Sequence, residues 1–551
     1  MKKLVYILPS LVIAGLLSTS CNNLDTKPMS DILTEQQKDE LFNTDPSQIA
    51  SMVSALYTAL FEGSASSSYF GYESLAITME CHTADFVMTT PQNALSFAEC
   101  AEYRDNTATS AYANAKWNNP YGIIYIANQL LAVLDNLDPD RENKTYNGYR
   151  MHALGIRAFE YLFLIQNFQF TYATHKDALG VPLVTTENMW TVGSEGCPRS
   201  SVEEVYQQIF SDLNDAIIFA EETGSSRTGK GELDVYTLYG LRARANLLTL
   251  NYAAALEDSE KVINSGSYVP LSAEGCKVPG FNDSNSSNWM WSVIRSDNPG
   301  KSSYTFGAYV NPFDQGWNGG APYTIDAALF NKISSDDPRR LWWIDEDYYS
   351  AANNYTNAVP YADESSPYYN LNAVEVLSER DIPVYGVVKF APYQNQLLQT
   401  EDISDYPLMR IEEMYLIKAE AQALSGNLEG GKQTLEQFVN TYRWTGSNPY
   451  VSSSANKEDF LKNEVWFQRR IEFWGEGLSY FDLLRYRYPM DRQQPGSSWT
   501  GELGAENNIS NYAFVIQPNN TVLISLLPQG EIENNRLIGD AQQNVPGQPT
   551  M

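Results

Sequence analysis

The spacing of apolar residues near the C-terminal end of the chain predicts a pair of amphipathic helices. One apolar stripe, with positions three and four apart, consists of Met414, Ile417, Ala421 and Leu424. Gly426 is placed to end that helix, and a second stripe follows on Leu435, Phe438, Val439 and Tyr442. Two such helices joined by a short turn can bury their apolar faces only if other hairpins stack on them. The chain should therefore contain further helical hairpins.

The same helical period recurs through the N-terminal half of the chain. It predicts helices over residues 49–63, 121–137, 149–168, 200–220, 237–250 and 252–265. Ser200 or Ser201 is placed to cap the fourth of these, whose first turn is acidic as the helix dipole favours. Small residues at Gly240, Ala243 and Ala245 permit the close packing of tetratricopeptide-like helices. The predicted fold is mostly α, with tetratricopeptide-like helical hairpins that form a scaffold.

The helical period is lost between residues 269 and 404, where glycine, proline, asparagine, serine and aromatic residues are frequent. Five of the eleven tryptophans lie there, namely Trp289, Trp291, Trp317, Trp342 and Trp343. So long a segment without regular structure is typical of a functional surface rather than of a linker. A pyranose packs its C–H face on an aromatic ring while polar neighbours bind its hydroxyl groups. We therefore interpret the segment as an irregular, aromatic-rich insertion that binds sugar, although most single rings in it are expected to be core.

Trp317 is the aromatic residue whose surroundings most favour exposure. It lies in Asp314-Gln-Gly-Trp-Asn-Gly-Gly320, where glycines and polar side chains are typical of a loop tip. Trp289 and Trp291 alternate around Met290 at strand spacing and should point to the same face. The candidate glycan-binding residues of the insertion are Trp317, Asn318, Trp289 and Tyr323.

Several sequence patterns resemble the SusD/RagB family, the outer-membrane nutrient-binding lipoproteins of the Bacteroidetes. The C-terminal patterns are Arg410-x-x-Glu413-Met-Tyr-Leu-Ile, Arg469-Arg470-x-Glu472-Phe473 and Glu476-Gly477-x-x-x-Phe481-Asp482-Leu483-x-Arg485. Two N-terminal patterns, Ala153-x-x-x-Arg157-Ala158-x-x-Tyr161 and Val181-Pro-Leu-Val184, are similar to the family's first helical hairpin and the segment after it. Gln468 and Ser479 depart from the family, which usually has Glu and Arg there, and this puts a local salt-bridge network in doubt.

The resemblance implies a function as well as a fold. Members of the family capture a nutrient and act as a lid on a SusC-like TonB-dependent transporter, with their helical face docked on its barrel. The N-terminal excursion usually forms the other half of the ligand cleft, which nominates Asp85, Gln92, Asn93 and Tyr72. Trp342 and Trp343 follow a segment that resembles a structural turn of the family, so they are expected to be packed.

The N-terminus is typical of an exported lipoprotein. Lys2 and Lys3 precede an apolar run, Leu4–Leu17, that is shorter than the roughly twenty residues of a membrane span. Small residues then lead to Cys21, the predicted site of lipidation, which would hold the protein at the surface of the outer membrane. The predicted parts are a signal peptide (1–20), a lipidated tether (21–45), a helical scaffold (46–268), the insertion (269–404) and a C-terminal helical hairpin with its tail (405–551).

Composition narrows the choice of partners. After loss of Lys2 and Lys3 the chain keeps 35 of its 37 basic residues against 67 acidic ones, a formal charge of about −32. Such a chain repels the phosphate backbone, so nucleic acid is not an expected partner. The four cysteines after Cys21 allow three disulfide pairings or four free thiols, and the sequence does not choose among them.

The sequence offers no convincing catalytic motif. Gly224-Ser-Ser-Arg-Thr-Gly229-Lys230 has the spacing of a phosphate-binding loop, but Gly231 replaces the Ser or Thr that would hold magnesium. The three histidines form no zinc-binding pair. We therefore expect a non-catalytic glycan-binding protein without cofactor or metal. The alternatives are the same lid with a peptide or another small nutrient as cargo, or, with less support, a glycoside hydrolase that uses a carboxylate pair.

Overall fold

The computed structural model describes residues 47–63, 66–89, 97–224, 227–278, 280–295, 304–314, 323–399, 403–500 and 512–549. The chain divides into two units, residues 1–51 and residues 52–551. Of the first unit only the opening turn of helix α2 (Ser47–Phe61) is described, and all contacts given below lie within the second unit. None of the helices in the described ranges combines the length and hydropathy that crossing a membrane requires.

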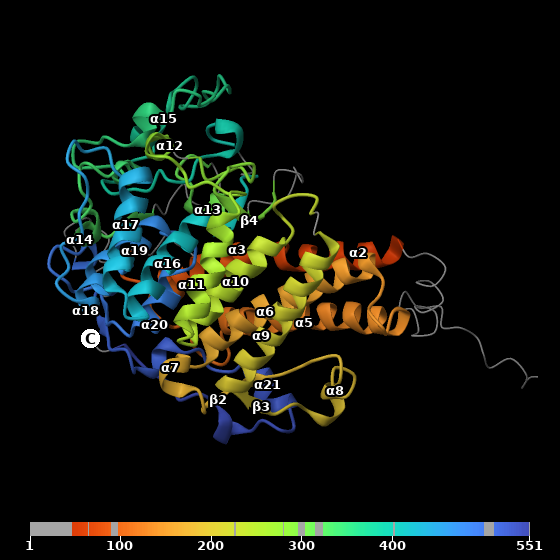
Figure 1. Ribbon diagram of the computed structural model, residues 1–551. Helices are drawn as coiled ribbons and strands as arrows, with labels where there is room; N and C mark the ends of the chain where they lie inside the picture. The colour runs from red at the N-terminus through yellow and green to blue at the C-terminus, as the bar shows by residue number, and fades with distance from the viewer. Residues whose placement is uncertain are drawn as a thin grey trace, which may run out of the picture. The chain divides into compact units, whose positions relative to one another are not determined.

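The long helices of the second unit pack one on the next. Helix α5 packs on α6, α6 on α9, α9 on α10 and α10 on α11 (Figure 1). The next helix in the stack, α16, packs on α11 although almost 150 residues separate them in sequence, and α17 packs on α16. Their bounds are α5 (Ala111–Leu137), α6 (Lys144–Phe168), α9 (Val202–Thr223), α10 (Val235–Leu248), α11 (Tyr252–Asn264), α16 (Ile411–Leu424) and α17 (Leu428–Tyr442). The predicted fold of stacked helical hairpins is confirmed.

Local sequence explains where these helices begin and how closely they pack. Ser201 caps α9 in a capping box, in which its hydroxyl accepts the Glu204 N–H and the Glu204 carboxylate accepts the Ser201 N–H. Gly240 of α10 has no side chain to separate the helix from the strand beside it. A Cβ atom there would lie 2.5 Å from the sulfur of Met409, so a larger residue would force the Met409 side chain to shift.

The insertion contains short elements around a hydrophobic core of its own. That core includes Ile344, Val376 and Leu398. Two antiparallel strand pairs connect the insertion to the rest of the unit: β4 with β6, and β5 with β1. The elements are α12 (Ala273–Lys277), β4 (Trp289–Val293), α13 (Phe306–Val310), β5 (Tyr323–Ile325), α14 (Ala327–Phe330), α15 (Ala373–Glu379) and the 3₁₀ turns η2 (Pro338–Trp342), η3 (Ala351–Asn354) and η4 (Tyr393–Asn395). The partner strands are β1 (Phe86–Met88) and β6 (Tyr406–Arg410).

Short elements complete the two ends of the unit. The N-terminal ones are α3 (Tyr72–Cys81), α4 (Ala98–Ala101), α7 (Tyr172–His175), β2 (Leu179–Pro182), α8 (Val192–Glu195) and β3 (Arg199–Ser201). The C-terminal ones are α18 (Lys457–Asp459), the π-helical turn η5 (Phe460–Val465), α19 (Trp466–Glu472), α20 (Ser479–Tyr486), β7 (Met490–Asp491), η6 (Ser498–Thr500), β8 (Val515–Ile516), η8 (Thr521–Leu523), α21 (Gln529–Asn534) and η9 (Asp540–Gln542). Strand β2 pairs with β3 and β7 with β8. The C-terminal tail packs back on α6, where the Asn544 amide donates to the Phe168 carbonyl at 2.8 Å.

The four cysteines of the second unit are buried free thiols, namely Cys81, Cys100, Cys197 and Cys276. Of the possibilities that the sequence leaves open, the structure therefore has the one without disulfides. Burial raises the pKa of the Cys276 thiol to about 12, so it stays protonated at neutral pH.

Candidate functional site

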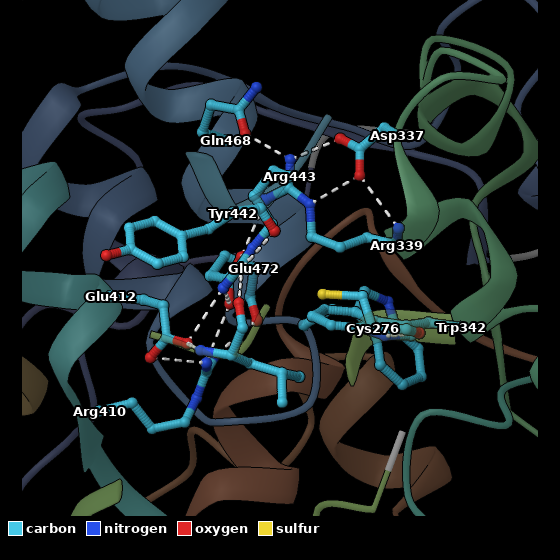
Figure 2. Close-up of polar contacts among 12 residues, drawn as sticks. Cys276, Asp337, Arg339, Trp342, Arg410, Glu412, Tyr442, Arg443, Gln468 and Glu472 are labelled. Atoms are coloured by element: carbon cyan, nitrogen blue, oxygen red, sulfur yellow. Dashed lines mark hydrogen bonds and ion pairs between the residues drawn. The ribbon is translucent and has the colours of Figure 1, made fainter. Parts of the chain in front are cut away.

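A buried network of ion pairs lies where the insertion meets the C-terminal helices (Figure 2). At its centre the Glu472 carboxylate accepts N–H groups from Arg410 at 2.9 Å, Arg443 at 2.7 Å and Arg339 at 2.9 Å. Burial opposes ionisation of this carboxyl, but Arg443, Arg410 and Arg339 together hold the pKa of Glu472 well below its usual value. Arg339 belongs to the insertion and Glu472 to α19, so the network joins the insertion to the helical scaffold.

The network is balanced in charge despite the departure at position 468. Gln468 accepts an N–H group of Arg339 with its side-chain oxygen (Figure 2). The cations of the network are Arg339, Lys389, Arg410 and Arg443, and its carboxylates are Asp337, Glu412, Glu472 and Glu476. Four charges of each sign leave no need for a further carboxylate, so a neutral amide at position 468 is compatible with an intact network.

Glu73, at the start of α3, contacts the chain on both sides of residues 296–303. Its Oε2 accepts the Nε–H of Arg295 at 2.9 Å, and its Oε1 accepts the backbone N–H of Phe306 at 3.1 Å. Glu73 is fully buried, as is most of Arg295. One buried carboxylate therefore binds both Arg295 and the backbone N–H of Phe306, and it holds these two described residues close together.

The described residues around two further stretches, 90–96 and 315–322, also lie together. Met88, at the end of β1, is the Cα partner of Tyr323, at the start of β5. Phe97 packs edge-on against Tyr309 of α13, with ring centroids 5.2 Å apart. Described residues that precede or follow these stretches are therefore in contact with one another in pairs: Met88 with Tyr323, and Phe97 with Tyr309.

One pocket in the described structure has a volume of about 560 Å³, within the usual range for ligand sites. We call it the Trp466 pocket. It lies beside η5, α19 and α20, and its lining includes Asp85, Lys332, Lys462, Trp466, Ser479 and Tyr488. Ser479 is the second position at which the sequence departs from the SusD/RagB pattern. A small side chain there leaves space that the long Arg side chain would occupy.

Comparison with known families matches most of the chain in two parts. The profile of the SusD family matches residues 280–547. A second profile, described as starch-binding associating with outer membrane, matches residues 24–228. The chain belongs to the SusD family.

Solved structures of SusD proteins share this fold. A SusD-like carbohydrate-binding protein from Bacteroides vulgatus is 21% identical, with a TM-score of 0.71 over 91% of this chain and 98% of that one. A SusD superfamily protein from Bacteroides thetaiotaomicron is also 21% identical, with a TM-score of 0.69 over 91% of this chain and 99% of that one. A curated relative, the SusD-like protein P38 of Formosa agariphila, is 23% identical over 69% of this chain and 73% of its own length.

Five of the residues predicted from the sequence to act in this SusD protein lie outside the described residues. They are the lipidation site Cys21 and the glycan-binding candidates Gln92, Asn93, Trp317 and Asn318. The four glycan-binding candidates belong to the stretches 90–96 and 315–322, whose described flanks, Met88 and Tyr323, are paired.

The structure corrects the prediction for three aromatic candidates. Trp289 is 1% exposed and Tyr323 is 2% exposed, so neither presents a ring face on which a sugar could stack. Tyr72 is buried against Phe159 and Phe163 of α6. Each ring fills the core between elements that are distant in sequence, which the spacing of residues along one strand or helix does not reveal.

Asp85 is also buried, and its carboxylate is engaged within the protein. One oxygen accepts the Nε–H of Arg470 at 2.7 Å and the other accepts a second N–H of the same guanidinium. Its backbone carbonyl accepts the indole N–H of Trp474 at 2.8 Å. Asp85 therefore positions β1 and lines the Trp466 pocket, which corrects the expectation of a carboxylate free to bind sugar hydroxyl groups.

Two features of the site were missed by sequence reasoning. The first is Glu73, which contacts Arg295 although the two residues are 222 positions apart in the sequence. The second is the Trp466 pocket, whose residues come from four separate segments. A buried Glu next to Tyr72 has no periodicity or motif that would distinguish it from the other acidic residues. The departure at Ser479 was the one local signal that pointed to the pocket.

Proposed function

We propose that this protein is a cell-surface lipoprotein that captures an oligosaccharide or polysaccharide and passes it to a SusC-like TonB-dependent transporter. Membership of the SusD family carries the proposal, because one matching profile is described as starch-binding and associated with the outer membrane. A structural neighbour is described as a carbohydrate-binding protein. We propose further that the protein is not an enzyme and that Cys21 bears the lipid.

The proposed glycan site consists of Trp317, Asn318, Gln92 and Asn93. The pairing of Met88 with Tyr323 supports this choice, because Met88 lies just before one stretch and Tyr323 just after the other. Phe97, which follows the first stretch, contacts Tyr309 of α13. A glycan bound across these stretches would stack on Trp317 and hydrogen-bond to the three amide side chains.

A glycan panel tests the function and a tryptophan variant tests the site. We expect the purified protein to bind at least one glycan in affinity gels and calorimetry, and to release no product on incubation with it. Trp317→Ala should weaken that binding by about tenfold or more, because a stacked aromatic ring contributes much of a sugar's binding energy. The control is Trp190→Ala, since Trp190 is 53% exposed and outside the proposed site.

Each result of these experiments has a separate meaning. Unchanged affinity of Trp317→Ala for its best glycan would show that the site is wrong while the function stands. Failure to bind any glycan, or turnover of a sugar polymer by the purified chain, would overturn the function itself.

A further inference from the structure

The Trp466 pocket combines an aromatic wall with cationic side chains. The rings of Trp466 and Tyr488 lie 4.7 Å apart, and Tyr486 stacks on Tyr488 at 5.4 Å. The guanidinium of Arg470 lies over the Trp466 ring at 4.5 Å, and the ammonium of Lys462 lies 5.5 Å from the Tyr488 ring. Such a wall suits the C–H face of a sugar ring, and the cations suit an acidic group.

The lysines of the pocket have no counter-ion in the described structure. Both lysines are exposed, and neither the Lys332 nor the Lys462 ammonium group forms an ion pair or a hydrogen bond with any described residue. Arg470 is already neutralised by Asp85, and the remaining acid of the lining is Asp491, which accepts the backbone N–H of Gln493 at 2.9 Å. In a chain of formal charge −30, two unpaired cations at one pocket favour an anionic ligand.

Two polar atoms in the pocket wall have no partner among the described residues. They are the indole Nε1 of Trp466 and the hydroxyl of Ser479, whose residue is 5% exposed. Buried polar groups in proteins are almost always hydrogen-bonded, so each unpaired one requires a reason. Both atoms are inaccessible to solvent, so neither is presented to a ligand in this structure and neither contributes to the choice of ligand.

The backbone around the pocket is unusual on two sides. The π-helical turn η5 carries Lys462 and leads directly into Trp466, and π turns are frequent at functional sites. Arg487 adopts a left-handed conformation with φ of 56°, which is uncommon for a residue other than glycine, and ends α20 just before Tyr488. The π-helical turn lies directly before Trp466 and the left-handed residue lies directly before Tyr488, and both of these rings belong to the aromatic wall.

We propose that the Trp466 pocket is a second binding site, for an acidic sugar unit such as a uronic acid. The carboxylate of the sugar pairs with Lys462 and Lys332, its ring packs on Trp466 and Tyr488, and Asp491 accepts from its hydroxyl groups. The choice of a sugar rests on the proposed glycan-binding function.

Ligand-observed NMR and calorimetry with two simple probes test the ligand class. We expect methyl β-D-glucuronide to bind and methyl β-D-glucoside to bind at least about fivefold more weakly. Lys462→Gln and Lys332→Gln should each weaken glucuronide binding about two- to fivefold, and added salt should do the same. Lys144→Gln is the matched control, because Lys144 is exposed on α6 away from the pocket.

A pocket-filling variant tests the location. Ser479→Arg should abolish glucuronide binding by occupying the pocket, while the glycan binding that depends on Trp317 persists. Absence of glucuronide binding, equal affinity for both probes, or lysine variants that bind as the parent does would each overturn the proposal. A further outcome is a protein that binds glucuronide through its lysines and yet binds no glycan of the panel. That result would support the pocket and refute the proposed function. Failure of the pocket proposal and failure of the proposed function are therefore distinguishable.

Discussion

At the scale of single residues, Glu160 is a carboxyl group buried in α6 without the partners that such a group usually has. It is 2% exposed and its Oε1 accepts no hydrogen bond from any described residue. Burial raises the pKa of Glu160 from 4.5 to about 8. The folded protein therefore keeps this proton at neutral pH, whereas the unfolded chain loses it above its ordinary pKa.

We expect stability to fall as the pH rises through this window. A folded-state pKa above the unfolded one gives stability that is complete below about pH 4.5 and lost up to about pH 8, by roughly 1.4 kcal/mol per pH unit. Glu160→Gln should flatten this dependence, which urea unfolding from pH 5 to 9 would measure. Glu187→Gln, at an exposed glutamate, should keep the parent slope; an equal slope for both variants would contradict the assignment.

At the scale of elements, the buried ion pairs determine how the insertion joins the helical scaffold. Arg443→Met should lower the free energy of unfolding by about 3–5 kcal/mol, because it removes one of the cations that keep buried Glu472 ionised. Arg141→Met is the matched control, since Arg141 and Asp135 form an exposed pair at 4.0 Å, and it should cost less than about 1 kcal/mol. Denaturant unfolding measures both variants. A similar loss of unfolding free energy in the two would show that burial does not determine how much an ion pair contributes to stability.

Glu73 gives a second prediction at this scale, on the proposed glycan site. Glu73→Gln leaves Arg295 without its carboxylate and weakens the contact with the Phe306 N–H. We expect faster hydrogen exchange over residues 304–310 and weaker glycan binding, because both ends of the stretch 296–303 lose a shared partner. The Trp466 pocket uses neither residue, so glucuronide binding should be unchanged; parallel loss of both activities would indicate general unfolding instead.

At the scale of the whole molecule, we predict that Cys21 decides where the protein works. Cys21→Ala should move the protein from the outer-membrane fraction to the soluble fraction, since acyl chains on the cysteine supply the membrane affinity. Cell fractionation and immunoblotting measure this, with Trp317→Ala as the control that should remain with the membrane. A Cys21→Ala protein that still fractionates with the outer membrane would refute the lipid anchor.

The sequence by itself determined the stack of helical hairpins and the family. The apolar period of three and four residues is set by the geometry of a single helix, so Met414 to Leu424 predicts α16 without knowledge of its neighbours. The start of α5 was less predictable: the helix begins at Ala111 and passes through Pro120, a residue usually found at helix starts.

Only the tertiary structure decided which rings and charges are available to a ligand. Trp289 lies in strand β4, and the alternation of side chains along that strand can be predicted from the local sequence. Its burial, however, depends on pairing with β6, more than a hundred residues away. Asp85 is engaged by Arg470, and Glu73 by Arg295, through contacts that no local pattern encodes. Backbone periodicity is a property of neighbouring residues, whereas burial and pairing arise from segments that meet only on folding; the Trp466 pocket exists for that reason.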